Sequence, residues 1–175
     1  KNPGKLAYGS AGNGTATHLR LEMLKLKAGL DILHVPYRGS GDALTDLLAN
    51  NVQMMNENVV LPHVRTGKLT LLAINHATRH PDFPDVPTLA EAGLPDADIP
   101  IWFSIWAPDG TPEAVLGKLH GKIREISQSD WMKDKMRSLS FGTRELSRDE
   151  LSKLLDADMA TNEKLIRSAN IKIEG

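Results

Sequence analysis

Cysteine is absent from this chain of 175 residues, which excludes thiol chemistry and a cysteine-based zinc site. A surplus of positive charge is also missing, because the formal net charge is −1. Proteins that bind nucleic acid through its phosphates normally carry a strongly basic surface, so we expect no nucleic acid among the partners. No run of residues approaches the roughly 20 consecutive apolar residues that a membrane-spanning helix needs.

The chain has the composition of an ordinary globular protein, with 41% hydrophobic and 25% charged residues. Up to about Asn75, β-rich runs alternate with helical patterns, which predicts parallel βαβ units. The last part of the chain is mostly helical in period. The predicted strands lie at residues 5–9, 32–35, 52–55, 69–74 and 99–108, and the predicted helices at 15–28, 42–49, 112–127, from 130, and 147–170.

The run Gly9–Thr15 reads GSAGNGT and connects the first predicted strand to the first predicted helix. Backbone N–H groups at a helix N-terminus lack partners within the helix, and the helix dipole favours an anion there. Ser10, Asn13 and Thr15 add polar side chains at the same point. The spacing G-x-x-G-x-G differs from the dinucleotide-binding pattern, and no P-loop lysine follows. The junction alone fits an anion site and a simple turn equally well.

A second strand-to-helix junction, within HVPYRGSGDALTDLL, follows the second predicted strand. Ligands of open α/β sheets bind beyond the carboxyl ends of the strands, so we expect both junctions to face one crevice. Tyr37 and Arg38 could close over an acidic ligand there, although an ordinary solvated arginine is the simpler interpretation of Arg38.

Three histidines invite catalytic or metal-binding hypotheses. His18 lies in the first turn of the first predicted helix, and with Ser10 it suggests a serine hydrolase, but the nucleophile motif G-x-S-x-G is absent. His76 and His80 are four residues apart, but they lie in a proline-rich loop without the glutamate of H-E-x-x-H. We therefore expect a binding protein without catalysis, metal or cofactor, and keep a Ser/His hydrolase of small esters as the weaker alternative.

Five sequence blocks follow one another along the chain: YGSAGNGTATHL, HVPYRGSGDALTDLL, HVRTGKLTLLAI, FPDVPTLAEAGLP and WAPDGTP. In these blocks and their order the chain resembles the TctC-like, or Bug, extracytoplasmic solute receptors of tripartite tricarboxylate transporters. The resemblance implies an α/β fold of the type II periplasmic-binding-protein kind, with two lobes of mixed or parallel sheets flanked by helices. It also implies capture of a small organic acid, commonly a carboxylate, and delivery to the membrane components of a transporter.

Members of this family are longer, so the resemblance implies that the chain is the C-terminal portion of such a receptor. Residues 1–98 would form lobe two with its ligand-binding loop, and residues 99–175 would supply the crossover strand and helices that complete lobe one. The location would be the periplasm, with the signal peptide outside this chain. We expect such a fragment to dimerise, since a lobe without its first strands exposes sheet edge and core surface.

The family loop that holds the ligand carboxylate corresponds to Ser10–Thr15, in agreement with the helix-terminus argument. Asn56 and Glu57 stand where the family commonly has a phenylalanine and an aspartate, so we expect an altered selectivity. A ligand-sensing regulatory domain is an alternative that uses the same cleft. The predicted ligand-binding residues are Ser10, Ala11, Gly12, Asn13, Gly14, Thr15, Tyr37 and Glu57.

Overall fold

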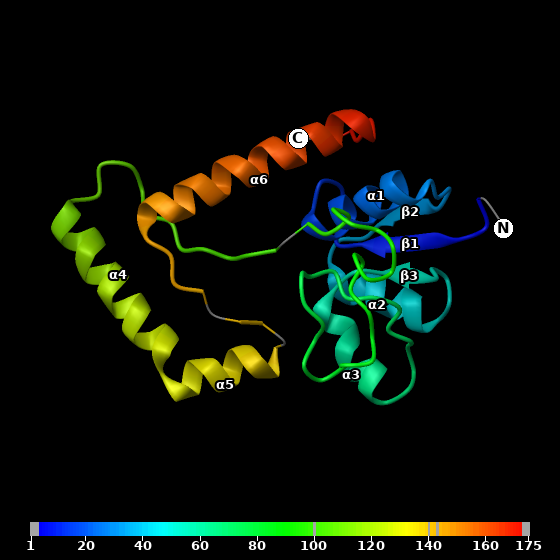
Figure 1. Ribbon diagram of the computed structural model, residues 1–175, viewed down its shortest axis with the longest axis horizontal. Helices are drawn as coiled ribbons and strands as arrows, with labels where there is room; N and C mark the ends of the chain where they lie inside the picture. The colour runs from blue at the N-terminus through cyan, green and yellow to red at the C-terminus, as the bar shows by residue number, and fades with distance from the viewer. Residues whose placement is uncertain (1–3, 100, 140, 143, 173–175) are drawn as a thin grey trace. The chain divides into compact units, whose positions relative to one another are not determined.

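The structure is a computed structural model that describes residues 4–99, 101–139, 141–142 and 144–172. Contacts within the chain divide it into two compact units, coloured along the sequence in Figure 1. Unit 1 comprises Lys1–Ile101 and Asp158–Gly175, and unit 2 comprises Trp102–Ala157. The assignment of residues 1–98 and 99–175 to two lobes of a longer protein stays a prediction.

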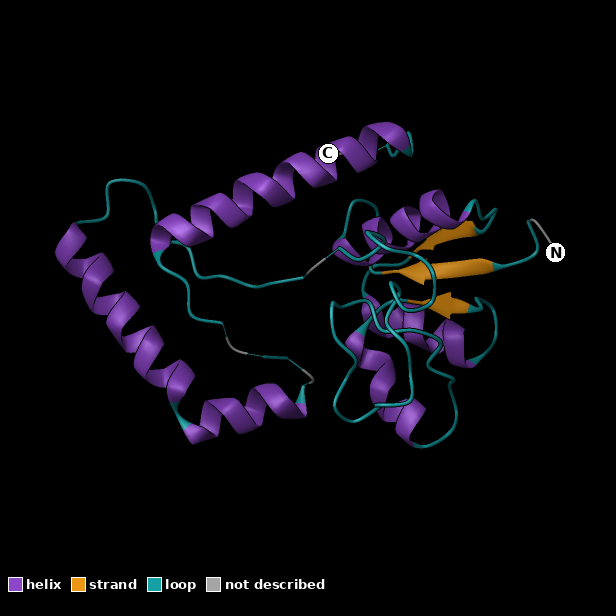
Figure 2. Ribbon diagram, viewed as in Figure 1, coloured by secondary structure: helices purple, strands orange, loops and turns teal. Residues whose placement is uncertain are grey.

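A three-stranded parallel sheet forms the centre of unit 1 (Figure 2). Strand β1 (Ala7–Ser10) lies between β2 (Leu33–Pro36) and β3 (Met54–Met55). Helix α1 (Ala16–Ala28) connects β1 to β2, and α2 (Ser40–Leu48) connects β2 to β3. The βαβ alternation predicted from the sequence is confirmed here, and the carboxyl ends of all three strands lie at one edge of the sheet.

The two helices cover opposite faces of β1. Tyr8 is fully buried in a cluster with Leu21 of α1 and with Ile32. The next residue, Gly9, faces the other way, because a Cβ built there would lie 3.3 Å from the Cβ of Ala43 in α2. The order β2-β1-β3 requires this arrangement, since right-handed crossovers that leave in opposite directions place their helices on opposite faces.

A second cluster attaches the C-terminal end of the chain to unit 1. Leu165 of α6 (Arg148–Ser168) is 1% exposed and packs with Leu19 of α1 and with Ile99. The remaining helices of unit 1 are short: a 3-10 turn at Asn58–Val60 and α3 at Leu61–Arg65.

Two of the predicted strands are wrong. In the predicted strand 69–74 only Ile74 pairs, in a single bridge with Thr88, and Leu72 is 69% exposed. Along the predicted strand 99–108 the described residues form an irregular segment, in which Phe103 is 81% exposed. β-Propensity measures how well a side chain fits a paired, half-buried surface, and the described residues supply no neighbouring strand for either run.

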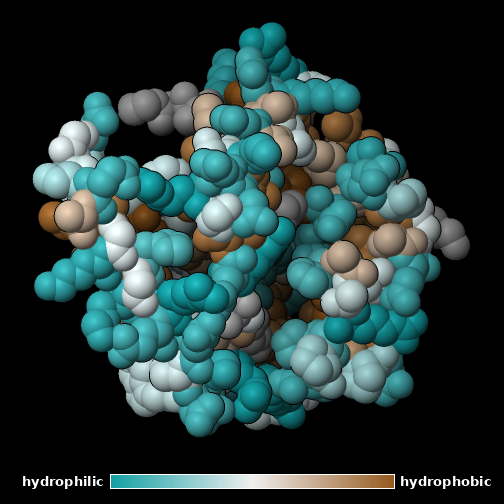
Figure 3. Space-filling view, turned by 60° about the vertical axis from the view of Figure 1, so that its left-hand side comes forward, coloured by the Kyte–Doolittle hydropathy of each residue, from teal (hydrophilic) through white to brown (hydrophobic). Residues whose placement is uncertain are grey.

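Unit 2 contains α4 (Glu113–Gln128), α5 (Asp130–Ser138) and the first turns of α6. These helices agree with the three predicted from the sequence. Among its described residues no side chain is buried, and several large apolar ones are exposed, including Trp106, Leu119 and Trp131. Figure 3 shows brown hydrophobic residues exposed among teal hydrophilic ones on the face that it presents.

Candidate functional site

Three loops leave the carboxyl edge of the sheet, one after each strand. Residues 11–15 follow β1, Tyr37 begins the segment after β2, and Asn56 with Glu57 follows β3. The first two loops are in contact, because the Tyr37 N–H donates to the Ser10 carbonyl at 3.0 Å. The sequence prediction that the two glycine-containing junctions face one region is therefore consistent with the sheet topology.

The loop 11–15 depends on two glycines. Gly12 has φ 132° and Gly14 has φ 72°, in the region that side chains disfavour. A Cβ on Gly12 would also lie 3.3 Å from the Tyr37 carbonyl oxygen. Thr15 closes the turn, since its hydroxyl donates to the Gly12 carbonyl at 2.7 Å.

Most backbone N–H groups of this loop already have acceptors inside the protein. The four hydrogen bonds run from Ala11 to Thr17 Oγ1 (3.0 Å), from Gly12 to Ser10 Oγ (3.2 Å), from Gly14 to His18 Nδ1 (3.0 Å) and from Thr15 to the Gly12 carbonyl (3.4 Å). The loop is therefore held in one shape by its own polar groups, and these four N–H groups are not free for a ligand.

The first turn of α1, in contrast, is uncapped. Thr15 occupies the N-cap position without a side-chain capping bond, and no acidic residue lies in the first turn. Within the described part of the chain, the backbone N–H groups of Asn13, Ala16, Thr17 and His18 make no hydrogen bond to the protein. These donors, with the positive end of the helix dipole, form a place where a carboxylate or phosphate oxygen would be stabilised.

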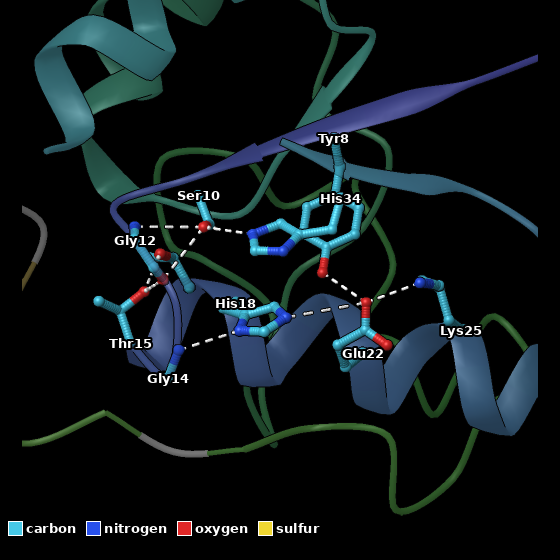
Figure 4. A network of polar contacts seen from close by, with 10 residues as sticks. Tyr8, Ser10, Gly12, Gly14, Thr15, His18, Glu22, Lys25 and His34 are labelled. Carbon is cyan, nitrogen blue, oxygen red and sulfur yellow. Dashed lines mark hydrogen bonds and ion pairs between the residues drawn. The ribbon is translucent and has the colours of Figure 1, made fainter. Parts of the chain in front are cut away.

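Behind the loop lies a buried polar network, drawn in Figure 4. The Tyr8 hydroxyl donates to Glu22 Oε1 at 2.6 Å, and Lys25 Nζ donates to the same oxygen at 2.6 Å. Burial alone would raise the pKa of Glu22, but the hydrogen bonds from Lys25 and Tyr8 outweigh it and lower the pKa. Burial, together with this carboxylate, raises the pKa of Tyr8 far above its usual range. Glu22 is therefore an ion and Tyr8 a neutral donor at neutral pH.

Two histidine rings occupy the space between this network and the loop. The rings of His18 and His34 stack with centroids 3.8 Å apart and planes inclined by 8°. Burial lowers the pKa of His18, an effect that Glu22 partly offsets. Burial and the neighbouring His18 lower the pKa of His34 to about 4. Both rings are consequently neutral at pH 7.

The histidine that Ser10 contacts is not the one expected from the sequence. Ser10 Oγ lies 2.7 Å from His34 Nε2, while His18 accepts from the Gly14 N–H instead. Ser10 is 0% exposed, so its hydroxyl cannot reach a substrate in this conformation. The pairing of Ser10 with His18 that a hydrolase would need is wrong for this structure.

A separate group of polar side chains surrounds Arg20 on α1. Its Nε donates to the Ile99 carbonyl at 2.7 Å, and its NH1 donates to Asn56 Oδ1 at 3.1 Å. Burial lowers the pKa of Arg20 to about 10, against the opposing influence of Glu57 and Asp98. Burial also raises the pKa of Glu57, with Ser40 and Arg20 acting in the opposite direction. Arg20 thus ties α1 to the segment after β3.

Tyr37 lies at the edge as predicted, but its hydroxyl is occupied. It donates to Asp46 Oδ2 at 2.7 Å, and burial with this hydrogen bond raises the pKa of Tyr37 to about 12. Its ring lies against Gly9 of β1 and its carbonyl against Gly12, so Tyr37 shapes the start of the loop without offering its hydroxyl.

Arg20, Glu22 and His34 were not among the site residues predicted from the sequence. The i, i+4 spacing of His18 and Glu22 was a usable signal, since it places both on one helix face. His34 gave no such signal, because its partner Ser10 lies 24 residues away along the chain. The described residues also include no group of three or more His, Asp or Glu side chains placed to hold a metal ion.

Comparison with known proteins assigns the family. Residues 1–171 match the family described as "Tripartite tricarboxylate transporter family receptor". The chain belongs to this receptor family. A UPF0065 protein from the tcbD-tcbE intergenic region of Pseudomonas sp. (strain P51) is 36% identical over 169 residues, which are 95% of this chain and 50% of that relative.

Solved structures of similar proteins support the same receptor fold. The R. palustris protein Rpa4515 with adipate has a TM-score of 0.88 at 31% identity, over 97% of this chain and 57% of that one. MatC from Rhodopseudomonas palustris with bound malate has a TM-score of 0.82 at 28% identity, over 93% and 57%. The periplasmic-binding-protein fold expected from the sequence is confirmed, and the chain spans about half the length of the relatives it matches.

No helix in the described ranges is long and apolar enough to cross a membrane.

Proposed function

We propose that this chain is the ligand-binding part of a periplasmic receptor that captures a small organic acid and passes it to the membrane components of a tripartite tricarboxylate transporter. The observation that carries the proposal is the uncapped N-terminus of α1 at the carboxyl edge of the sheet. One carboxylate of the ligand accepts hydrogen bonds from the Asn13, Ala16 and Thr17 N–H groups. Family membership and the adipate and malate carried by two similar structures support this ligand class.

This assignment refines the predicted set of ligand-binding residues. Asn13 and the first helical turn face the ligand, whereas Ser10, Gly12 and Gly14 maintain the loop through internal hydrogen bonds. Glu57 lies beyond β3 at the same edge, and it accepts a hydrogen bond from a donor on the ligand if one is present. We propose binding without catalysis, and the burial of Ser10, which keeps its hydroxyl from a bound molecule, supports this.

Replacing Gly14 with valine tests the site. Gly14 has φ 72°, so a β-branched residue forces the loop into another shape and should abolish binding of adipate and malate. Gly67→Val is the matched control, because Gly67 also has φ 72° and a Cβ there meets nothing within 4 Å. Ligand at about 100 times its Kd stabilises the protein by about 2.7 kcal/mol, which a thermal-shift assay detects.

The assay should use both the 175-residue chain and a family-length protein that contains it. We expect a shift in the wild type and in Gly67→Val, and none in Gly14→Val. A Gly14→Val protein that binds both acids as well as Gly67→Val does would refute the proposed site. If the wild-type protein responds to neither acid in both the 175-residue and the family-length forms, this ligand class is refuted.

We also propose that the 175-residue chain by itself forms a dimer, because the apolar side chains of unit 2 remain exposed. Light scattering should then give twice the monomer mass. A monomer mass across the accessible concentration range would refute the dimer.

A further inference from the structure

His18 holds one particular group of the ligand loop. The Gly14 N–H donates to His18 Nδ1 at 3.0 Å, which requires a ring without a proton on Nδ1. The proton of the neutral ring is therefore on Nε2, which lies 4.0 Å from Glu22 Oε1. His18 is 5% exposed, so little bulk solvent reaches the ring to replace this hydrogen bond.

The ring is also fixed from behind. It stacks on His34 at 3.8 Å, and His34 is in turn 2.7 Å from Ser10 Oγ (Figure 4). On the other side Glu22 is fixed by Tyr8 and Lys25 at 2.6 Å each. Two elements of the sheet and one helix thus brace a single imidazole that touches the loop at Gly14.

The peptide group between Asn13 and Gly14 needs such a restraint. Gly12 and Gly14 both have positive φ, and glycine passes easily between backbone conformations. Rotation of this peptide would exchange its N–H and C=O directions and disturb the neighbouring Asn13 N–H. A carbonyl turned toward a carboxylate would repel it. The bond to His18 Nδ1 selects one of these orientations.

We propose that His18 is a positioning residue, which holds the glycine loop in the shape that binds a carboxylate without touching the ligand. The proposal depends on the proposed function for the identity of the ligand site. On this proposal, the loop 11–15 is supported by His18 and by the side chains of β1, α1 and β2 that hold the His18 ring. If only about a tenth of the molecules keep the binding shape when this support is lost, the apparent Kd rises about tenfold.

Two substitutions separate positioning from simple packing. His18→Leu keeps apolar bulk but removes the acceptor. His18→Asn removes the ring as well, but its Oδ1 is attached to Cγ as Nδ1 is and can accept from the Gly14 N–H. Both variants lose the stacking on His34, so stacking does not contribute to the difference between them, and exchange of the Gly14 amide reports on the acceptor.

The experiment measures adipate and malate affinity by calorimetry, hydrogen exchange of the Gly14 amide without ligand, and the unfolding midpoint of each variant. We expect affinity about tenfold weaker in His18→Leu, and restored to within about threefold of the wild type in His18→Asn. Exchange of the Gly14 amide should be fast in the leucine variant and slow in the asparagine variant.

Equal Gly14 exchange in the two variants would overturn the role of His18, whatever the ligand proves to be. Equal loss of affinity in both would overturn it too, since a packing role alone predicts that result. A wild type that binds neither acid while Gly14 exchange still follows the acceptor would refute the proposed function and leave the support of the loop in place.

Discussion

The two units of this chain differ in how they are stabilised. In unit 1, Tyr8, Ser10 and Ala43 are 0% exposed and pack around a sheet. In unit 2, over the residues that the structure describes, no side chain is buried, and Ile105 is 74% exposed. Helices form from local patterns, but a core requires a partner surface. Unit 1 therefore contains its own stabilising core and the candidate site, whereas the helices of unit 2 present apolar faces for which the described residues form no core.

The contacts of unit 2 are mainly between residues close in sequence or at the surface. Ser129 caps α5 by accepting from the Met132 N–H, and Ser147 with Glu150 forms a reciprocal capping box at the start of α6. Arg148 pairs with Glu113 through two hydrogen bonds of 2.9 Å in solvent. Such contacts define helix ends, but they contribute less to the free energy of unfolding than the buried core of unit 1 does.

The largest effect that separates the units should come from a matched pair of leucines. Leu165→Ala removes a side chain that is 1% exposed between Leu19 and Ile99, so it should lower the free energy of unfolding by about 2–5 kcal/mol. Leu119→Ala removes one that is 50% exposed on α4, and should cost about 0.5 kcal/mol or less. Urea denaturation at several protein concentrations measures both costs and separates them from any contribution of dimer dissociation. Equal costs would show that α4 is buried within a single chain.

The next largest effect concerns the buried network of unit 1. Tyr8→Phe removes the hydroxyl that donates to Glu22 at 2.6 Å, and should cost about 1.5–3 kcal/mol because the acceptor is charged and buried. Tyr37→Phe removes a similar bond to the half-buried Asp46 and should cost less. If the two variants unfold at the same denaturant concentration, the network of Tyr8 adds no special stability.

A smaller effect should appear in the pH dependence of stability. The pKa of His34 falls from its ordinary 6.5 to about 4 on folding, so between these values the unfolded chain binds more protons than the folded one. The contribution of the neutral ring is complete above pH 6.5 and is lost as the pH falls toward 4. His34→Gln should flatten this decline in urea denaturation at pH 7, 6 and 5. An unchanged slope in that variant would show that His34 does not titrate in this way.

The smallest effect should follow a change in unit 2. Arg148→Gln breaks the exposed pair with Glu113, which salt and solvent screen, so the unfolding midpoint should stay within experimental error. The same measurement with Leu165→Ala provides the positive control. A large loss would mean that the pair is shielded from solvent in the folded protein.

The sequence predicted what depends on local pattern. The helices α1, α2 and α4 to α6 lie close to their predicted positions. The predicted strand at 99–108 was wrong because a β-prone apolar run forms a strand only beside a pairing strand, and its own residues do not reveal whether one is present. The same reasoning explains Leu72, which the pattern assigned to a strand and the structure leaves exposed.

For the site, the glycine loop was identified from spacing and family resemblance, but its support was not. Gly12 and Gly14 could be identified from the sequence, because backbone positions with positive φ favour glycine. The stacking of His18 on His34 joins a helix to the neighbouring strand, and no local pattern encodes that contact. Which N–H groups stay free also depends on contacts such as Ala11 to Thr17, which only the folded loop reveals.

The most direct test of the central claim is to follow the backbone amide signals of the isotopically labelled protein by NMR while adipate or malate is added. The account predicts that the largest shift changes fall on Asn13, Ala16 and Thr17, because it assigns the ligand carboxylate to their N–H groups at the uncapped end of α1. Shift changes that leave these three amides unaffected and gather elsewhere in the protein would contradict it.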